Sequence, residues 1–242
     1  MNKIGTAFVA FCILFLAAWS PLETSNNSVT RLSLDDRDFC SGVIVERINE
    51  DFVYMATAAH CADATAIPAE KKIYLPNGSY KIKYYSIYPK LRIKQDKVDE
   101  NGNVLSSVDM DASFVQEDTV NDVAIYIVYD AGFTVPASLF VSDVKYGDKV
   151  YAMGMPLAIW GTISSGEVSK PRLGNVQGLP DYIPQDAIVH TAYMKPGISG
   201  GGLFNDKGEL IGLTNWGIAG GPYLATRVSH VIDLLKEIKN ED

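Results

Sequence analysis

The feature of this sequence that most restricts its fold is a series of short segments rich in β-branched and aromatic residues. Turn-forming runs such as Pro76-Asn77-Gly78 and Asn205-Asp206-Lys207-Gly208 separate them, which is typical of β-strands. Many short strands with glycine and proline between them indicate an all-β barrel or sandwich. The strands that we expect cover residues 39–45, 52–57, 72–75, 80–88, 123–129, 149–153, 187–191 and 210–214.

Three other stretches depart from this pattern. Residues 90–118 are polar, with Asp99-Glu100-Asn101-Gly102-Asn103 near their centre, so we expect a long loop with a hairpin extension. Residues 166–186 are rich in Pro and Gly and are expected to form a second long loop. Loops of this length often serve function, so each is a candidate for shaping a cleft, with surface decoration as the alternative. Near the C-terminus, helical spacing of apolar residues predicts a helix over residues 228–239 that packs on the barrel; these residues are Val228, Val231, Leu235 and Ile238.

The first residues have the pattern of a targeting segment. Lys3 precedes a nearly unbroken apolar stretch over residues 7–19, and polar residues follow from 20 to 27. This predicts a signal peptide over residues 1–24, with an uncleaved N-terminal anchor as the alternative because no clean Ala-x-Ala cleavage site is present. We therefore expect export to the periplasm or the extracellular space. Without this segment two cysteines remain, Cys40 and Cys61, as a disulfide or as two buried thiols.

The size and charge of the chain narrow its possible partners. With 242 residues it can bury a sizeable core, as one large domain or as two small halves. Its formal net charge is −8, and it contains neither a basic block nor a basic–aromatic stripe. We therefore expect neither nucleic acid nor a membrane surface as a partner, apart from the N-terminal anchor. The oligomeric state stays open.

Three local patterns carry residues suited to nucleophilic catalysis. His60 follows a strand end in Thr57-Ala58-Ala59-His60-Cys61, and Asp122 precedes an apolar strand in Asn121-Asp122-Val123-Ala124-Ile125. Ser199 stands in a glycine-rich turn, Pro196-Gly197-Ile198-Ser199-Gly200-Gly201-Gly202-Leu203. A serine hydroxyl needs an adjacent base, a histidine can take and return its proton, and a buried carboxylate orients the imidazole.

The glycines around the serine meet a separate requirement. Backbone N–H groups must converge on the oxyanion that forms during acyl transfer, and most side chains would obstruct such a turn. We assign these N–H groups to Gly197 and Ser199. Each pattern alone is more often structural, as a buried histidine, a capping acid or a simple turn. Their combination predicts a catalytic triad of His60, Asp122 and Ser199.

Together these residues resemble the trypsin/chymotrypsin-like serine proteases, and most of all the bacterial branch of HtrA/Deg-type proteases and glutamyl endopeptidases. The resemblance implies two six-stranded antiparallel β-barrels, over about residues 30–132 and 133–227, in one protease domain spanning residues 30–240. The run Phe39-Cys40-Ser41-Gly42-Val43-Ile44 resembles the family's strand whose cysteine bridges to the one after the catalytic histidine, which implies a Cys40–Cys61 disulfide. HtrA-type proteases usually add a peptide-binding PDZ domain, for which we expect no room after Ile238.

The chain departs from the family pattern at three places. Ile198 stands where digestive members have an Asp that pairs with a newly released N-terminus, so we expect no zymogen-type activation. The run Thr214-Asn215-Trp216-Gly217 stands where Ser-Trp-Gly is common; we expect it to pair with the substrate backbone, and the effect of Asn215 on Asp122 stays open. Tyr193 stands at the base of the specificity pocket, where members specific for Arg or Lys have an Asp. The resemblance therefore implies a mostly apolar pocket for small or medium uncharged side chains, lined by Tyr193, Thr214 and Gly217.

The remaining polar residues have structural interpretations. We expect structural roles for His190 and His230, and a solvated charge run for Asp109, Asp111 and Asp118, whose spacing matches no calcium loop. We expect no metal and no cofactor. The predicted function is that of a serine endopeptidase that cleaves protein or peptide substrates. Two alternatives remain, a pseudoprotease that uses the scaffold to bind a partner, and an esterase.

Overall fold

The computed structural model describes residues 21–98, 104–130, 132–155, 161–179, 183–217 and 222–241. Residues 1–20 of the predicted targeting segment lie outside these ranges. Within the ranges, no helix combines the length and the apolar character needed to cross a membrane.

The first half contains α1 (Pro21–Asn26), β1 (Val29–Leu34), β2 (Arg37–Arg47), β3 (Phe52–Thr57), α2 (Ala59–Asp63), β4 (Ile67–Tyr74), β5 (Tyr80–Ile87), β6 (Leu91–Val98), β7 (Val104–Asp118) and β8 (Val123–Tyr129). The second half contains β9 (Ser138–Leu139), β10 (Lys149–Gly154), β11 (Thr162–Lys170), β12 (Ile188–His190), β13 (Gly201–Asn205), β14 (Glu209–Gly217), β15 (Tyr223–Arg227) and α3 (Val228–Glu241).

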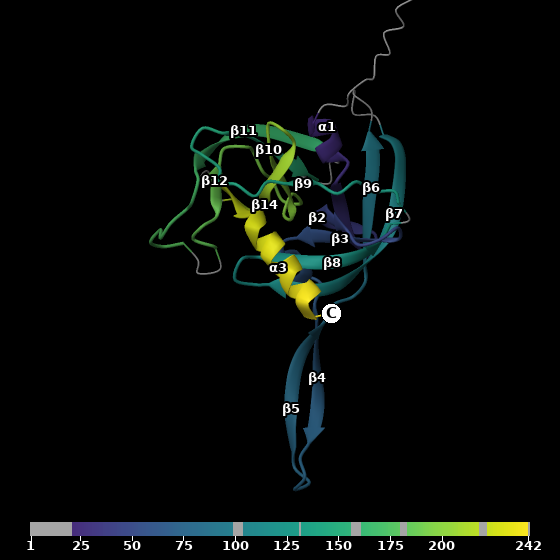
Figure 1. The fold of residues 1–242 in the computed structure, drawn as a ribbon. Helices are drawn as coiled ribbons and strands as arrows, with labels where there is room; N and C mark the ends of the chain where they lie inside the picture. The colour runs from purple at the N-terminus through teal and green to yellow at the C-terminus, as the bar shows by residue number, and fades with distance from the viewer. Residues whose placement is uncertain are drawn as a thin grey trace, which may run out of the picture.

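Strands of the first half close a barrel in the order β1-β2-β3-β8-β7-β6 (Figure 1). All neighbours in this barrel are antiparallel. Successive side chains of a strand point to opposite faces, and each strand contributes one face to the apolar interior. Ile44, Met55 and Tyr126 are among the largest side chains that are fully buried there.

Strands of the second half close another barrel in the order β13-β10-β11-β12-β15-β14, because β14 pairs back onto β13. The short β9 adds to β14 as a parallel strand. Val150, Ile188 and Leu203 are buried in the interior of this barrel. The predicted fold class, two six-stranded antiparallel barrels with a C-terminal helix, is confirmed.

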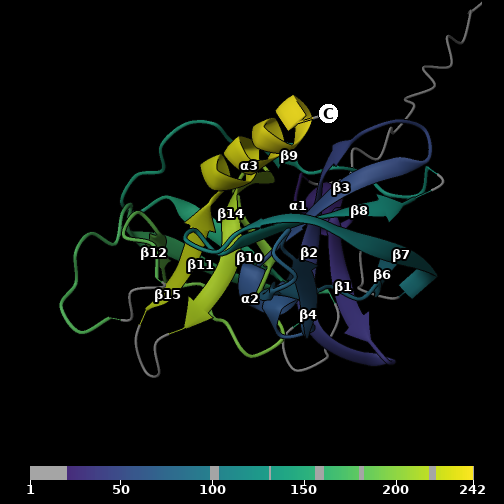
Figure 2. The ribbon, with the colours of Figure 1, turned by 90° about the horizontal axis from the view of Figure 1, so that it is seen from below.

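A further apolar cluster joins the two barrels to α3, which lies across both of them (Figures 1 and 2). The helix packs against β7 and β8 of the first barrel and against β14 and β15 of the second. Its predicted apolar face is confirmed, and burying each such side chain stabilises the fold by roughly 1.5–3 kcal/mol. The buried residues of the helix are Val228, Val231, Leu234, Leu235 and Ile238.

The prediction of a long loop over residues 90–118 is wrong, whereas the hairpin expected within this stretch is confirmed. β6 and β7 lie in this stretch and form an antiparallel pair in the wall of the first barrel. Only alternate residues of these strands, such as Ile93 and Met110, face the interior, whereas Asp109 and Asp111 are exposed. The polar composition that suggested a loop is the solvent face of two half-buried strands.

The second predicted loop, over residues 166–186, is wrong in its first residues. β11 continues to Lys170, but nearly all of its positions are exposed or half-buried, so it lacks the apolar alternation by which strands are recognised. The eight predicted strands all overlap observed ones. β4 begins earlier than predicted, at Ile67.

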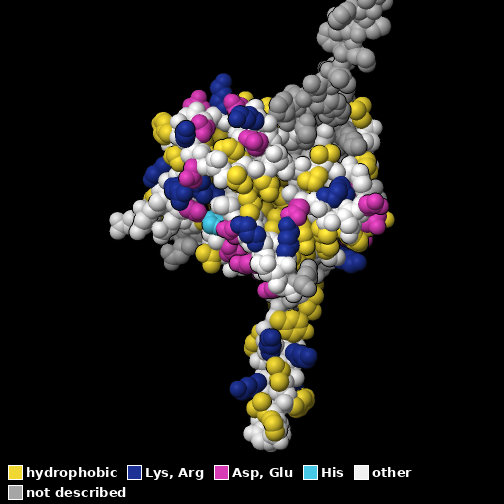
Figure 3. All heavy atoms as spheres, viewed as in Figure 1, with side chains coloured by type: hydrophobic (Ala, Val, Ile, Leu, Met, Phe, Trp, Pro, Cys, Tyr) yellow, Lys and Arg dark blue, Asp and Glu magenta, His cyan; other side chains and the backbone are white. Residues whose placement is uncertain are grey.

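A hairpin formed by β4 and β5 projects from the first barrel (Figure 1). Within the described residues these strands pair with each other and with no third strand. Both faces of the hairpin are exposed to solvent, and apolar and lysine side chains cover it (Figure 3). It therefore adds little to the core; its large exposed apolar residues are Ile67, Ile73, Tyr74, Tyr80, Ile82, Tyr84, Tyr85 and Ile87.

The two histidines outside the predicted triad have different surroundings. Nε2 of His230 lies 2.8 Å from Oδ2 of Asp186, and this hydrogen bond raises the pKa of His230 and lowers the pKa of Asp186. His190 is fully buried in β12, and burial lowers its pKa to about 4, so its ring is neutral at physiological pH. Among the described residues, neither of its ring nitrogens finds a hydrogen bond of normal geometry, although the backbone of Ala192 is close enough to oppose the shift in pKa weakly.

Replacing residues 67–87 with a short Gly-Ser linker is expected to leave both barrels folded. Ile67 pairs with Ile87, so the ends that the linker joins lie side by side, and closing a short loop costs little entropy. We expect one cooperative thermal transition with a midpoint within about 5 °C of the parent protein, measured by circular dichroism. A midpoint lowered by about 10 °C or more would show that the hairpin stabilises the first barrel.

Replacing His230 with Gln is expected to lower the free energy of unfolding near pH 6 but not near pH 9. Because the folded-state pKa of His230 is raised, its contribution is complete below the unfolded-state pKa of about 6.5 and is lost as the pH rises through the folded-state pKa. On the acid side the contribution is lost again, as the pH falls through the lowered pKa of Asp186. Both groups are partly exposed, so we expect an effect of about 1 kcal/mol or less.

Urea denaturation of the parent and the variant at both pH values measures this difference. Lys236→Gln, which removes an exposed ion pair with Asp233, is a matched control that should show no such dependence on pH. An equal loss of stability at both pH values in His230→Gln would contradict the ion pair.

Candidate active site

His60 lies on the short helix α2, directly after the end of β3. Its backbone N–H donates to Oδ1 of Asp122 at 2.8 Å, and its ring Nδ1 lies 2.8 Å from Oδ2 of the same carboxylate. Since a carboxylate is an acceptor only, Nδ1 carries the proton and Nε2 keeps a free lone pair. The side chain is 43% exposed, so the ring can reach a bound molecule.

Asp122 precedes β8 and is 4% exposed. Its φ of 54° lies in the left-handed region, which Asp tolerates better than most residues and which often marks functional sites. The turn before it is shaped by Asp118, whose Oδ1 accepts the backbone N–H groups of Val120 and Asn121 at 3.0 Å. The expectation that Asp118 belongs to a solvated charge run is therefore wrong, because its carboxylate organises the turn that presents Asp122.

The second barrel also contributes to the environment of Asp122. Nδ2 of Asn215, on β14, donates to Oδ2 of Asp122 at 2.8 Å and to its backbone oxygen at 2.9 Å. The same amide lies 3.0 Å from Oγ1 of Thr226, which in turn donates to the backbone oxygen of Asn121 at 2.8 Å. Asn215 therefore donates to the same carboxylate oxygen that binds the His60 ring, which answers the question that the sequence left open.

Ser199 lies in the turn before β13, at the junction of the two barrels. Its backbone oxygen accepts the N–H of Ser41 at 2.8 Å. Gly200 has a φ of +79°, and a Cβ there would collide with Thr57 and with the backbone of Ser41, so only glycine fits. The hydroxyl of Ser199 makes one long hydrogen bond, 3.4 Å to the backbone oxygen of Asn215, and none to His60 within the described residues. A weakly held hydroxyl can rotate toward the imidazole when a substrate binds, as such bonds often tighten only in the complex.

The backbone N–H groups of Gly197 and Ser199 donate no hydrogen bond within the described part of the chain. The peptide group between Gly197 and Ile198 is fixed by two hydrogen bonds. Oγ of Ser41 donates to the backbone oxygen of Gly197 at 2.8 Å, and the N–H of Ile198 donates to the backbone oxygen of Lys195 at 3.2 Å. Gly197 has a φ of 99°, which favours glycine. The turn thus holds two N–H groups available for an anion.

Ser41 is the positioning residue that the sequence analysis missed. Its side chain accepts the N–H of Met155 at 3.0 Å while it donates to Gly197, and its backbone oxygen accepts the hydroxyl of Thr57 at 2.7 Å. The residue was within the quoted run around Cys40, but its role depends on contacts more than a hundred residues away, which local patterns do not encode.

The residues of β14 that were predicted to bind substrate have different surroundings. Thr214 is fully buried, and its hydroxyl donates to the backbone oxygen of Ile198 at 2.8 Å, so it supports the turn of Ser199. Trp216 lies beside His60, with the two ring centroids 6.3 Å apart. Asn215 binds Asp122, as described above. Gly217 ends β14.

A row of paired residues continues from the end of β14 across the second barrel. Gly217 pairs with Tyr223, and Tyr223 pairs with the buried His190, so their side-chain positions share one face. A Cβ on Gly217 would lie 3.1 Å from the Tyr223 ring. The exposed Tyr193 packs edge-on against the same ring at a centroid distance of 5.7 Å. Tyr223, which the sequence analysis did not single out, therefore occupies the space beside Gly217.

A cavity of about 440 Å³ borders His60. Its wall combines the rings of His60 and Trp216 with the side chains of Asp63 and Thr119; Ala59 and Asp122 complete the lining.

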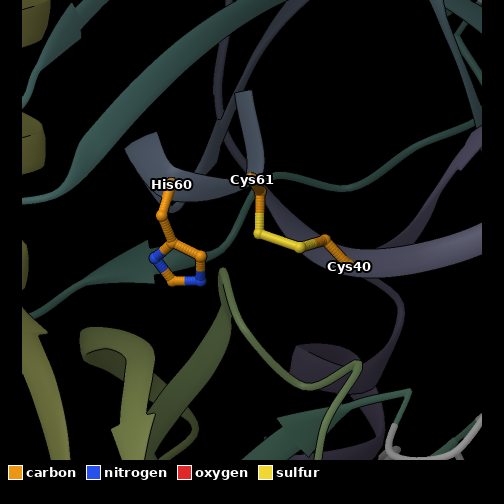
Figure 4. A group of neighbouring side chains, drawn as sticks. All are labelled: Cys40, His60 and Cys61. Carbon is orange, nitrogen blue, oxygen red and sulfur yellow. A yellow bond between two sulfur atoms is a disulfide. The ribbon is translucent and has the colours of Figure 1, made fainter. Parts of the chain in front are cut away.

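Cys40 and Cys61 form a disulfide next to His60 (Figure 4). The bond ties α2 to β2 and agrees with the pairing that the resemblance implied. The sulfur atoms and the His60 ring lie within 4.8 Å of one another, a distance at which three such side chains could ligate a metal. Both sulfurs are committed to the disulfide and Nδ1 is bound to Asp122. These residues therefore do not fit a metal site, because cysteine binds a metal as a thiolate.

Two antiparallel barrels, a carboxylate–imidazole pair on one and a serine-bearing glycine turn on the other define a trypsin-like double-barrel protein. The chain belongs to the trypsin-like peptidase family: residues 40–213 match the family model described as a trypsin-like peptidase domain.

Curated relatives of the chain are serine proteases. Serine protease HTRA3 of Mus musculus is 35% identical over 105 residues, which cover 41% of this chain and 22% of that protein. The periplasmic pH-dependent serine endoprotease DegQ of Escherichia coli is 33% identical over 116 residues, which cover 47% of this chain and 24% of that protein. The chain thus spans only about a quarter of the length of these relatives.

Solved structures share the fold over most of the chain. The serine endoprotease from Yersinia pestis has a TM-score of 0.60 at 19% identity, covering 90% of this chain and 65% of that one. An HtrA-type protease with a tripeptide has a TM-score of 0.63 at 21% identity, covering 90% of this chain and 62% of that one.

Proposed function

We propose that this protein is a serine endopeptidase with His60, Asp122 and Ser199 as its catalytic triad. The observation that carries the proposal is the Asp122 carboxylate, which binds His60 through Nδ1 and is itself held by Asn215 from the second barrel. A buried acid on Nδ1 leaves Nε2 as the base and stabilises the imidazolium that forms when the base takes a proton.

The proposed reaction proceeds in two acyl-transfer steps. Nε2 of His60 takes the hydroxyl proton of Ser199 as Oγ attacks the peptide carbonyl, and His60 then gives the proton to the leaving amine. Water, activated by the same imidazole, hydrolyses the acyl-enzyme. The N–H groups of Gly197 and Ser199 bind the oxyanion, and one such donor contributes about 2.7–4 kcal/mol to transition-state stabilisation. None of these steps requires a cofactor.

The oxyanion turn is proposed to be in place without proteolytic activation. Ile198 is 2% exposed and belongs to the apolar core of the second barrel, so hydrophobic burial supports the turn instead of an ion pair with a new N-terminus. Ser41 adds the hydrogen bond to Gly197.

We propose a preference for small uncharged side chains at the residue whose carbonyl is attacked. No acid stands at Tyr193, and the Tyr223 ring fills space beside Gly217. The substrate backbone would pair with the end of β14, at residues 215–217, in the manner of an added strand.

Export is also part of the proposal. Residues 1–24 would act as a signal peptide or anchor for a protease domain over residues 30–240, and the Cys40–Cys61 disulfide suits an oxidising compartment. The relative DegQ is named as periplasmic. The proposed substrates are proteins or peptides.

A fluorophosphonate probe is expected to label the purified protein at Ser199. Labelling should disappear in Ser199→Ala and in His60→Ala, and peptide hydrolysis should fall at least about 10⁴-fold in each. Ser142→Ala, an exposed serine in a loop of the second half, is the matched control and should keep labelling and activity. Mass spectrometry of the labelled peptide and a casein or peptide-library assay provide the measurements.

Each alternative function has its own outcome in this experiment. Absence of labelling in the oxidised protein would favour a pseudoprotease that binds a partner. Labelling with ester hydrolysis but no cleavage of any peptide would favour an esterase.

Tyr223→Ala is expected to widen the specificity pocket. Removing the ring should raise kcat/KM for substrates with Leu or Phe at the cleaved residue by about tenfold or more relative to Ala. Tyr146→Ala, which truncates a tyrosine that is 77% exposed, is the control and should leave this ratio unchanged. An unchanged profile in Tyr223→Ala would place the pocket elsewhere.

A further inference from the structure

We propose that the cavity beside His60 binds a cationic side chain of the substrate and that Asp63 selects it. This inference rests on the proposed function and names the substrate class: polypeptides with Lys or Arg immediately before the residue whose carbonyl is attacked. The cavity holds about 440 Å³, enough for a lysine or arginine side chain.

Asp63 is the carboxylate of the cavity that is available to a substrate. The other one, on Asp122, is buried and already bound by His60 and Asn215. Asp63 is exposed, and its hydrogen-bond partner is the hydroxyl of Tyr88 at a long 3.4 Å. Within the described residues, no lysine or arginine forms an ion pair with it.

The group behind Asp63 is a second carboxyl, that of Glu117, and not a cation. Tyr88 has one hydroxyl proton, and the shorter contact, 2.8 Å to Oε1 of Glu117, takes it in preference to Asp63. Oε2 of Glu117 is buried without a hydrogen-bond partner in the described part of the chain. Burial is the main cause that raises the pKa of Glu117, and the charges of Asp63 and Asp122 raise it further. A cation from the substrate would therefore supply the positive charge that this side of the cleft lacks.

The aromatic part of the cavity suits the same ligand. The Trp216 and His60 rings lie 6.3 Å apart and offer an apolar surface to the methylene groups of a lysine or arginine. The indole face attracts a nearby cation, and long basic side chains bury their stems while their charged ends reach polar groups. Stem and head would then contact Trp216 and Asp63 at the same time.

The position of this side chain in the substrate follows from strand geometry. A substrate that pairs with the end of β14 presents successive side chains to opposite faces. The residue that is cleaved points toward Gly217 and Tyr223, so the residue before it points to the opposite face of β14, where Trp216 borders the cavity.

The test uses fluorogenic peptides that are identical except for the residue before the cleaved one, which is Lys, norleucine or Glu. Norleucine has nearly the stem of lysine without its charge. We expect the parent protein to prefer Lys over norleucine by about five- to tenfold in kcat/KM, mainly through KM, because an exposed ion pair and a cation–π contact are each modest. In Asp63→Asn the ratio should fall to about two or less, because only the cation–π contact with Trp216 then favours Lys, and in Asp63→Lys the Glu peptide should become better than the Lys peptide.

Asp206→Asn is the matched control, since Asp206 is an exposed acid in the turn between β13 and β14; it should keep the parent ratio. High salt should reduce the Lys preference of the parent, because screening weakens an exposed ion pair. A purely structural role of Asp63 would change all three peptides together and would not reverse their order in Asp63→Lys.

The outcomes separate this proposal from the one on which it rests. A ratio of one or less in the parent, or an undiminished Lys preference in Asp63→Asn, would overturn the cation-binding subsite and leave the endopeptidase intact. Failure of the parent to cleave any of the peptides, together with absence of fluorophosphonate labelling, would overturn both.

Discussion

The site depends on one buried carboxylate, Asp122, that is shared between two barrels. A charged group that is 4% exposed is tolerated only when hydrogen bonds replace the lost water. Asp122 obtains them from the backbone and ring of His60 on the first barrel and from Asn215 on the second. Full hydrogen bonding of the carboxylate therefore requires that the two barrels are docked, so the geometry of the site depends on their docking.

Docking itself is achieved mainly by apolar packing. The cluster that includes Val43 and Ile125 of the first barrel and Phe204 of the second continues onto α3, and burial of this kind is proportional to area and not directional. Direction comes from the few hydrogen bonds across the junction. Ser41 provides two of them, from its N–H to Ser199 and from its hydroxyl to Gly197, so the turn before β13 has a fixed register against β2.

A feature of the structure could be predicted from the sequence when residues close together in the chain determine it. His60, Asp122 and Ser199 each lie in a short local run, and the three runs together are recognisable although each alone is more often structural. The apolar strands and the α3 face are periodic. β6 and β7 were hidden because their exposed residues are polar, and Asp118 because its carboxylate binds backbone groups that a pattern does not show. Ser41 and Tyr223 could not be found, since their roles arise from strand pairing across the barrels.

The short helix α2 concentrates these dependencies. A helix of five residues (Ala59–Asp63) is too short to be stable alone, so its orientation must be imposed from outside. The Cys40–Cys61 disulfide holds it on β2, and the N–H of His60 binds Asp122. Three side chains then leave one turn in different directions: His60 toward the carboxylate, Cys61 toward β2 and Asp63 toward the cavity. Because the same two restraints fix all three, an exchange at Asp63 can alter the charge of the cleft without releasing the imidazole from Asp122.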